Sequence, residues 1–300
     1  MPRLHGAVDS LAMWSEDLRR RTPVPFVGAA RDPLDCFGPL PPLPPPPGEK
    51  GTWEAPSPRP TAADPTMQVE VTPAWGRRRG TAVLVPPWKL PRLSVISGWI
   101  RMLARAGQEV WTLIPPLHLR RSPPGVPSGE AFVTPDLPAL RATFEQLVLE
   151  VRVLLSLAHG RREPVALLGL SLGGLGAALA TTAAEAPDRA AIVAPPADLQ
   201  AVVAGTRIGK RLLALARRAG RVPRAAELSP MLRPFRADAL RPRAGRVLVA
   251  VGSADGIAPP AAARALAGAW GAELRVYPRG HLTLLFLCQR LRRDVRRFLC

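Results

Sequence analysis

From about residue 67 onward, short apolar runs alternate with longer segments whose apolar residues recur every three or four positions. The short runs are bounded by Gly or Pro and predict buried strands, whereas the longer spacing predicts amphipathic helices. The predicted strands are 67–71, 81–85, 109–114, 165–168, 190–194, 246–251 and 273–277. The predicted helices are 94–106, 137–159, 174–184, 260–270 and 282–298. This alternation predicts an α/β protein with a mostly parallel sheet covered by helices on both faces.

Other segments have different patterns. Residues 8–21 have helical spacing and predict a helix that packs on the body, with a docking or membrane-touching helix as the alternative. Proline dominates residues 33–65, which predicts an extended linker or an arm along the surface, or a ligand for a proline-binding partner. We therefore divide the chain into an N-terminal helix and extension (1–32), the arm (33–65) and a folded domain (66–300). Within that domain, 197–244 holds helical pieces and no convincing strand.

The residues Gly169–Gly173 spell G-x-S-x-G between the predicted strand 165–168 and the predicted helix 174–184. A serine at the tip of such a tight strand-to-helix turn takes a strained backbone conformation. The residues two positions before and after it then approach other backbone so closely that only a hydrogen fits as side chain. The pattern therefore predicts that Ser171 presents its hydroxyl at the carboxyl edge of the sheet, where open α/β sheets place their sites.

The net charge of +18 raises the question of a polyanionic partner. The basic residues are almost all arginine, beside heavy use of Ala, Pro and Gly, which indicates a coding bias. Aromatic residues make up 5% of the chain and do not interleave with the arginines as a base-stacking surface requires. We therefore expect no nucleic acid partner, while a contact with an anionic membrane or an acidic substrate stays open.

Phosphate-binding loops are not supported. Gly174-x-Gly176 is followed by Leu179 where a dinucleotide loop needs Gly or Ala, and no Gly-Lys-Ser/Thr occurs. We expect no cofactor and no metal site, since the three cysteines (Cys36, Cys288 and Cys300) form neither a zinc pattern nor a disulfide framework. Scarce cysteine is typical of a reducing compartment, and we identify neither a secretory signal nor a membrane span, so we expect a cytoplasmic protein.

A serine hydroxyl needs a base within hydrogen-bonding reach before it can act as a nucleophile, and histidine suits this role. The chain has four histidines. His5 lies near the N-terminus, and His159 lies at a predicted helix C-terminus, where an interaction with the helix dipole explains it. His118 follows an early strand and is the lesser candidate. His281 directly follows the last predicted strand at the correct edge of the sheet and is the favoured base.

The base in turn needs an acid that orients it. Asp255 follows the predicted strand 246–251, in a loop of small residues (Gly252-Ser-Ala-Asp-Gly256), and is the favoured acid. The Asp-Gly pair is also a common turn, so turn formation is the alternative explanation of this aspartate. Asp198, one strand earlier, is the second candidate.

The chain from about Met67 to its C-terminus resembles the α/β-hydrolase fold superfamily. The resemblance rests on Gly169–Gly174, on Val251-Gly-Ser-Ala-Asp255, on Arg279-Gly-His-Leu282 and on the order nucleophile, acid, histidine. It implies an eight-stranded, mostly parallel sheet with a helical cap after the sixth strand, which is where 197–244 falls. It also implies a catalytic triad of Ser171, Asp255 and His281.

A narrower similarity concerns two segments. Pro115 to Pro124 with its arginines, and Gly280-His281 leading into Phe286, resemble an uncharacterised branch of this superfamily that is linked to phospholipid deacylation.

One departure from the superfamily concerns the oxyanion hole. The superfamily has His-Gly after its third strand, followed by a backbone amide that donates to the oxyanion; this chain has Pro86-Pro87, and neither proline has an N–H. The resemblance then implies donation by the amides of Leu172 and Trp88, with that of Lys89 as the alternative to Trp88. Losing one such donor costs about 3 kcal/mol of transition-state stabilisation.

These residues predict a serine hydrolase that acts on a carboxylic ester or related acyl compound, with lipids among the candidate substrates. The alternatives are a non-catalytic binding or scaffold protein that keeps the fold and uses the proline-rich arm, and a serine peptidase of the same fold. In the cap, Ile208, Leu212 and Leu215 share one helix face. This predicts a lid with arginines on its outer side, and contact with an anionic membrane is the alternative.

Overall fold

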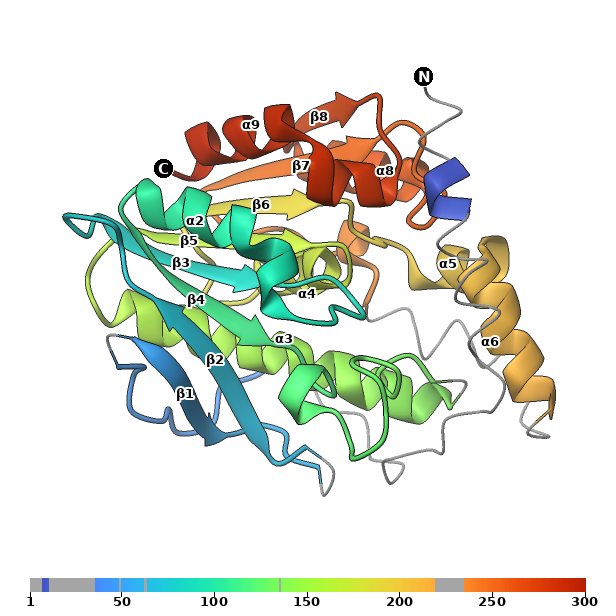
Figure 1. Cartoon of the computed structure of the whole chain (residues 1–300), viewed down its shortest axis with the longest axis horizontal. Helices are drawn as coiled ribbons and strands as arrows, with labels where there is room; N and C mark the ends of the chain where they lie inside the picture. Colours follow the sequence, from blue (N-terminus) through green and yellow to red (C-terminus); the bar gives the residue numbers. More distant parts are fainter. Residues whose placement is uncertain (1–6, 11–35, 49, 62–63, 135, 219–234) are drawn as a thin grey trace.

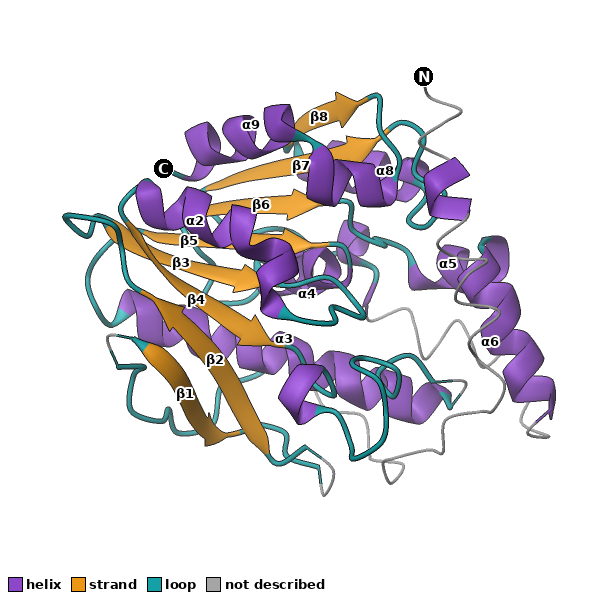
Figure 2. Cartoon of the chain, viewed as in Figure 1, coloured by secondary structure: helices purple, strands orange, loops and turns teal. Residues whose placement is uncertain are grey.

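The computed structural model describes residues 7–10, 36–48, 50–61, 64–134, 136–218 and 235–300. Within these residues eight strands form one sheet in the order β1-β2-β4-β3-β5-β6-β7-β8 (Figures 1 and 2). The strands are β1 Gly51–Pro56, β2 Thr66–Thr72, β3 Gly80–Val85, β4 Gln108–Ile114, β5 Val165–Leu170, β6 Arg189–Val193, β7 Arg246–Gly252 and β8 Glu273–Tyr277. The β1–β2 and β2–β4 pairs are antiparallel and all other pairs are parallel, so the predicted mostly parallel sheet is confirmed.

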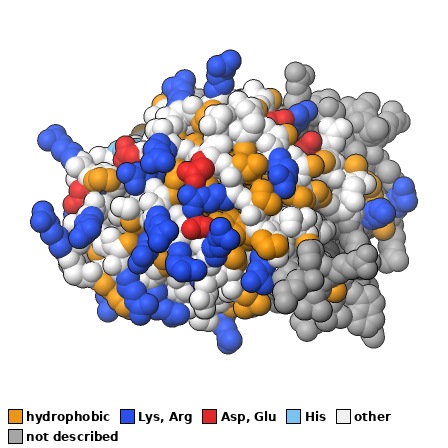
Figure 3. All heavy atoms as spheres, turned by 90° about the horizontal axis from the view of Figure 1, so that it is seen from above, with side chains coloured by type: hydrophobic (Ala, Val, Ile, Leu, Met, Phe, Trp, Pro, Cys, Tyr) orange, Lys and Arg blue, Asp and Glu red, His pale blue; other side chains and the backbone are white. Residues whose placement is uncertain are grey.

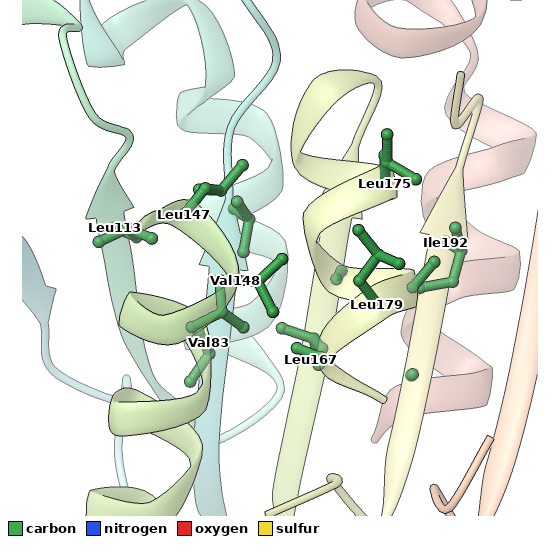
Figure 4. Close-up of a cluster of buried hydrophobic side chains, with 14 of the residues drawn as sticks. Val83, Leu113, Leu147, Val148, Leu167, Leu175, Leu179 and Ile192 are labelled. Atoms are coloured by element: carbon green, nitrogen blue, oxygen red, sulfur yellow. The ribbon is translucent and has the colours of Figure 1, made fainter. Parts of the chain in front are cut away.

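Helices cover both faces of the sheet. They are α2 Ser97–Arg105, α3 Leu137–His159, α4 Leu172–Ala180, α5 Leu199–Gly205, α6 Arg207–Arg218, α8 Pro260–Trp270 and α9 Gln289–Leu299. Side chains of α3, α4 and α8 share one buried apolar cluster with one face of the strands, and α2 and α9 share a second cluster with the other face. Figure 4 shows part of the first cluster, including Leu147 of α3 and Leu175 of α4.

Strand β3 illustrates why the central strands read as continuous apolar runs. Val83 and Val85 belong to the first cluster, whereas Ala82 and Leu84 belong to the second. Successive side chains of a strand point to opposite faces, so a strand covered on both faces buries every residue. The carboxyl ends of the parallel strands all meet at one edge, and in Figure 1 the helices α5 and α6 lie beyond the arrowheads at that edge.

The sheet begins earlier than predicted, because β1 lies inside the segment 33–65. The alternation of apolar and polar residues over 67–71 is typical of an edge strand, but β1 pairs with β2 from Gly51↔Val71 to Pro56↔Thr66, so β1 and not β2 lies at the edge of the sheet. The prolines on either side of it led to the linker prediction, but Gly51–Ala55 contains none and can supply its amides to a ladder. The described part of the arm is held on the body as well: Arg152 and Arg161 donate to the carbonyl oxygens of Cys36 and Pro47, at 2.6 and 2.9 Å.

A buried ionic cluster ties the segment after β1 to helix α3. Arg121 donates to both oxygens of Asp64 at 2.8 Å and to both oxygens of Glu150 at 2.7 Å, and all three side chains are inaccessible to solvent or nearly so. Burial raises the pKa of Asp64 to about 6, against the opposing effect of Arg121. Removing one partner of such a buried group costs about 3–5 kcal/mol, so Asp64 is held firmly against the body of the protein.

Two predicted helices end differently in the structure. The helix predicted over 174–184 begins at Leu172 and ends at Ala180, where Thr181 and Thr182 donate from their hydroxyls to carbonyl oxygens of the last turn. The helix predicted over 282–298 is divided into a π-helical turn, Thr283–Leu287, and helix α9. Side chains explain the break, because Trp99 and Arg292 donate to the carbonyl oxygens at the end of the first piece.

The segment 197–244 follows β6, the sixth strand, and contains α5, α6 and the 3₁₀ turn Ala237–Ala239. In α6 the described residues Gly209, Leu213 and Ala216 face the body, and Lys210 and Arg217 are exposed. The side chains of Ile208, Leu212 and Leu215 lie outside the described residues, as do residues 219–234 and nearly all of the predicted helix 8–21. The lid and the packing of that N-terminal helix therefore stay predictions.

Of the helices in the described ranges, none combines the length and the apolarity that a membrane crossing requires.

Candidate active site

Ser171 lies between β5 and α4, at the turn predicted from its flanking glycines. Its φ of 54° and ψ of −116° are in a region that non-glycine residues rarely adopt. A Cβ on Gly169 would overlap the backbone of Gly173, and a Cβ on Gly173 would overlap the carbonyl oxygens of Val85 and Pro86. These contacts explain why both positions are glycine, and they bring the end of β3 against the serine turn.

The structure brings together the three residues that the sequence favoured. His281 Nε2 lies 2.8 Å from Ser171 Oγ, and His281 Nδ1 lies 2.7 Å from Asp255 Oδ2. All three side chains are buried, with Ser171 the most accessible of them at 9%. The three residues come from the ends of β5, β7 and β8, so the sheet topology itself assembles them at one edge.

The second oxygen of Asp255 has a separate function. Asp255 Oδ1 accepts hydrogen bonds from the backbone amides of Ile257 at 2.9 Å and Ala258 at 2.8 Å. Turn formation, the alternative explanation of this aspartate, therefore occurs alongside its contact with His281. The two amide bonds fix the carboxylate so that its other oxygen faces the imidazole.

The other candidates have different partners. His159 is the last residue of α3, and its Nε2 lies 3.0 Å from the carbonyl oxygen of Ala186. Asp198 caps helix α5 by accepting from the amide of Ala201 at 2.9 Å. Neither contacts Ser171, and His5 lies outside the described residues.

His118, the lesser candidate for the base, is fully buried on the other side of the site. Its Nδ1 lies 2.8 Å from the carbonyl oxygen of Pro116, and its Nε2 accepts from the backbone amide of Lys89 at 3.2 Å. This bond overturns the Lys89 alternative for the oxyanion hole, because that N–H already has an acceptor. Burial lowers the pKa of His118 to about 4, so the imidazole is neutral at neutral pH, as an acceptor must be.

The loop after β3 is held from several sides. Trp88 Nε1 donates to the carbonyl oxygen of Gly129 at 2.7 Å, and Lys89 Nζ pairs with Glu130. Lys89 has a φ of 56°, which marks a sharp change in chain direction directly after Trp88. Leu172, directly after Ser171, is the first residue of α4, so its amide has no acceptor inside that helix. That the amides of Leu172 and Trp88 form an oxyanion hole stays a prediction.

An apolar pocket opens beside Ser171. Its empty space, counted together with the solvent at its mouth, is about 620 Å³, and Ser171 and Leu172 form part of its wall. Trp88 comes from the loop after β3, Phe144 from α3 and Val203 from α5. No charged side chain lines this pocket among the residues that the structure describes. The pocket is therefore suited to an apolar group next to the serine hydroxyl.

One carboxylate at the site was not found from the sequence. Asp9 is 1% exposed and accepts from the backbone amides of His281, Leu282 and Gly256, which lie on the loops that carry the histidine and the aspartate. An aspartate in an N-terminal segment carries no motif. A hint that such an acceptor is needed lies at Gly280, the residue before His281, because glycine has no side chain that could cap the helical segment that follows.

In the part of the chain that the structure describes, no group of three or more His, Cys, Asp or Glu side chains is arranged to hold a metal ion. In Figure 3 the Lys and Arg side chains are spread over the visible face among apolar and uncharged atoms.

Comparisons with known proteins give matches at the level of structure. No protein-family model matches the sequence, and no curated protein matches it. A Xanthomonas campestris α/β serine hydrolase described as lacking a lid is 19% identical, with a TM-score of 0.50 over 85% of this chain and 94% of that one. An acetyl xylan esterase from Paenibacillus sp. R4 is 18% identical, with a TM-score of 0.56 over 78% of this chain and 80% of that one.

Peptidases match as well. The Pyrococcus horikoshii acylaminoacyl peptidase is 14% identical, with a TM-score of 0.55 over 78% of this chain but only 38% of that one. At these identities the matches establish a shared fold and leave the substrate undetermined.

Proposed function

We propose that this chain, whose α/β-hydrolase fold the structural matches establish, is a serine hydrolase that cleaves carboxylic esters with an apolar acyl group. The observation that supports this best is the continuous chain of hydrogen bonds from Ser171 Oγ through His281 to Asp255, with bonds of 2.8 and 2.7 Å, which begins at a serine in the wall of an apolar pocket.

In the proposed reaction, His281 Nε2 takes the proton of Ser171 as Oγ attacks the ester carbonyl carbon. Asp255 orients the imidazole and balances the charge that it acquires. The developing oxyanion accepts hydrogen bonds from the amides of Leu172 and Trp88, and the N-terminus of α4 adds favourable electrostatics. His281 then gives its proton to the leaving alcohol, and it later activates the water that releases the acyl group from Ser171.

The pocket lining supports an apolar acyl group over a charged peptide terminus. A free carboxylate or ammonium of a peptide needs a charged or hydrogen-bonding partner once it leaves water. The lining supplies apolar side chains around the serine, so an ester of a fatty or other apolar acid fits better. Lipids are the natural compounds of this class, and the peptidase interpretation stays the weaker proposal.

The non-catalytic alternative has one specific observation in its favour. Pro86 and Pro87 have no amide N–H, and the N–H of Lys89 donates to His118, so the proposed second oxyanion donor of this loop depends on the position of the Trp88 amide. Against this alternative, a binding protein has no need of a buried Ser-His-Asp hydrogen-bond chain.

A fluorophosphonate probe tests the proposal directly, because it reacts with an activated serine hydroxyl. We expect labelling of the full chain, turnover of p-nitrophenyl butyrate, and loss of both in Ser171→Ala. Ser253→Ala, which changes an exposed serine near the same edge of the sheet, is the matched control and should keep both. Labelling that persists in Ser171→Ala, or a complete lack of labelling and turnover in the unchanged chain, would overturn the proposal.

The state of the cysteines bears on the cellular location. Of the cysteines, Cys36 and Cys288 are buried, and none of the three forms a disulfide bond. Cysteines outside disulfide bonds are typical of proteins in a reducing compartment, which supports the proposed cytoplasmic location.

A further inference from the structure

Asp9 connects the N-terminal segment to two loops of the proposed active site. Its Oδ2 accepts from the backbone amide of His281 at 2.7 Å and from that of Gly256 at 3.3 Å, while its Oδ1 accepts from that of Leu282 at 3.1 Å. The side chain is 1% exposed, although it lies 272 positions before His281 in the sequence. A buried carboxylate that accepts three backbone amides is held firmly in place.

The loop that carries His281 needs such an acceptor. His281 begins the helical segment that continues into Thr283–Leu287, and the first amides of a helix have no acceptor within it. A side chain at the preceding residue normally accepts from these amides, but that residue is Gly280. Asp9 therefore acts as an N-cap supplied from a distant part of the chain, and its negative charge suits a helix N-terminus.

The loop that carries Asp255 is completed in the same way. Asp255 Oδ1 accepts from the amides of Ile257 and Ala258, and Asp9 accepts from the amide of Gly256 directly before them. Three successive amides of this loop are thus satisfied by two carboxylates. One of these carboxylates also holds the histidine loop, so Asp9 fixes the two loops relative to each other.

We propose that Asp9 is a positioning residue for the hydrolase: by bridging the loops of His281 and Asp255, it holds the imidazole in register with Ser171. Full activity then depends on the docking of residues 7–10. This inference rests on the proposed function and extends it to a residue outside the three in the hydrogen-bond chain. A displacement of the imidazole of about 1 Å lowers turnover by about 10²-fold, which sets the scale of the expected effect.

The test uses the full chain and the variants Asp9→Ala and Asp9→Asn. We expect Asp9→Ala to lower kcat for p-nitrophenyl butyrate and the rate of fluorophosphonate labelling by about 10- to 100-fold. KM should be nearly unchanged, because Asp255 still holds Ile257 and Ala258, the residues of this loop that line the pocket. Asp9→Asn keeps one acceptor oxygen, so its kcat should lie between that of the unchanged chain and that of Asp9→Ala. Hydrogen exchange at the amides of His281 and Leu282 should be faster in Asp9→Ala.

Asp188→Ala is the matched control. Asp188 Oδ2 also accepts a backbone amide, that of Val165 at 2.8 Å, but Val165 begins β5 and so lies at the edge of the sheet opposite Ser171. This variant should lower the melting temperature and leave kcat unchanged.

The outcomes separate the two proposals. If the unchanged chain is active and Asp9→Ala keeps its kcat, the positioning role is wrong while the hydrolase proposal stands. If Asp9→Ala and Asp188→Ala lose activity equally and in proportion to unfolded protein, Asp9 is only structural. If the unchanged chain neither labels nor turns over ester, the hydrolase proposal fails first and the positioning role fails with it.

Discussion

The two sides of Ser171 are held by different means. On one side, His281 and Asp255 are held by side-chain atoms, through the bonds between them and those that Asp9 and Asp255 accept from the loop amides. On the other side, the loop after β3 follows a path set by two prolines, a residue with positive φ and a buried histidine. The geometry of the first side therefore depends on particular side chains, and the geometry of the second depends on the path of the backbone.

This difference decides what each side contributes. In the proposed mechanism, the histidine side moves protons, so its chemistry would be lost when a functional group is removed. In the same mechanism, the Trp88 side contributes a backbone N–H, which no substitution removes except proline, so displacing the loop is the way to test it. The variants below therefore remove a group on the first side and displace or loosen the backbone on the second.

The largest effect is expected from Asp255→Asn. The amide side chain keeps the size of the carboxylate but no longer stabilises the imidazolium, and the corresponding change in a serine protease lowers kcat by about 10⁴-fold. Turnover of p-nitrophenyl butyrate should fall by a similar factor. Asp198→Asn is the control, because Asp198 was the second candidate from the sequence and only caps α5, where asparagine serves equally well. A loss of less than tenfold in Asp255→Asn would remove Asp255 from the triad.

The next largest effect is expected from Gly173→Ala, which acts on the other side. The added methyl would overlap the carbonyl oxygens of Val85 and Pro86, so the loop after β3 must move away from the serine. Losing one oxyanion donor lowers kcat by about 10²- to 10³-fold, and we expect a fall of about 10²-fold in labelling and turnover.

Gly268→Ala on α8 is the control for this change, because nothing lies within 4 Å of an added Cβ there. Activity in Gly173→Ala equal to that of the control would mean that the loop after β3 does not contribute to catalysis.

The same contrast explains what could be predicted from the sequence. The serine turn, the loop of Asp255 and the loop of His281 are marked by residues whose chemistry or size is needed locally, and the predicted contacts among them occur in the structure. Their catalytic roles stay a prediction. The sheet was predictable for a similar reason, because strands buried on both faces give continuous apolar runs such as β3 and β5.

The features that were missed depend on partners distant in sequence. β1 forms only because β2 offers it a free edge, and its proline-rich surroundings concealed it. Asp9 accepts amides more than 240 positions away, which no local pattern records. The break before α9 depends on Trp99 and Arg292 reaching the carbonyl oxygens of the preceding turn.

The pH dependence of the free energy of unfolding tests whether His118 is buried and neutral beside the loop of Trp88. The folded state keeps this histidine neutral with a pKa of about 4, whereas the unfolded chain takes up the proton near 6.5. As pH falls from 7 to 4, the unfolded state is therefore favoured by about 3 kcal/mol. Arg121 and Lys89 lower the pKa of His118 further, and its bond to Pro116 opposes them.

His118→Gln keeps an acceptor for Lys89 but does not titrate. Urea unfolding at pH 7, 6, 5 and 4 should show the unchanged chain losing about 3 kcal/mol relative to this variant. Other groups, such as Asp64, titrate in both proteins and cancel in the difference. If the free energies of unfolding of the two proteins change with pH in parallel, His118 has the same pKa in the folded and unfolded states, and the proposed effect of burial is wrong.

The smallest effect is expected from a change that leaves both sides of Ser171 intact. Val203 lines the pocket from α5 and is buried, so Val203→Phe should shorten the space for the acyl chain without moving Ser171, His281 or the loop after β3. We expect the ratio of kcat/KM for p-nitrophenyl octanoate to that for the acetate to fall about tenfold, since misfitting methylenes in an apolar pocket have effects of this size. Val276→Phe, at an exposed valine of the edge strand β8, is the control and should leave the ratio unchanged. An unchanged ratio in Val203→Phe would mean that the acyl chain does not bind in this pocket, even if the hydrogen-bond chain on the histidine side is catalytic.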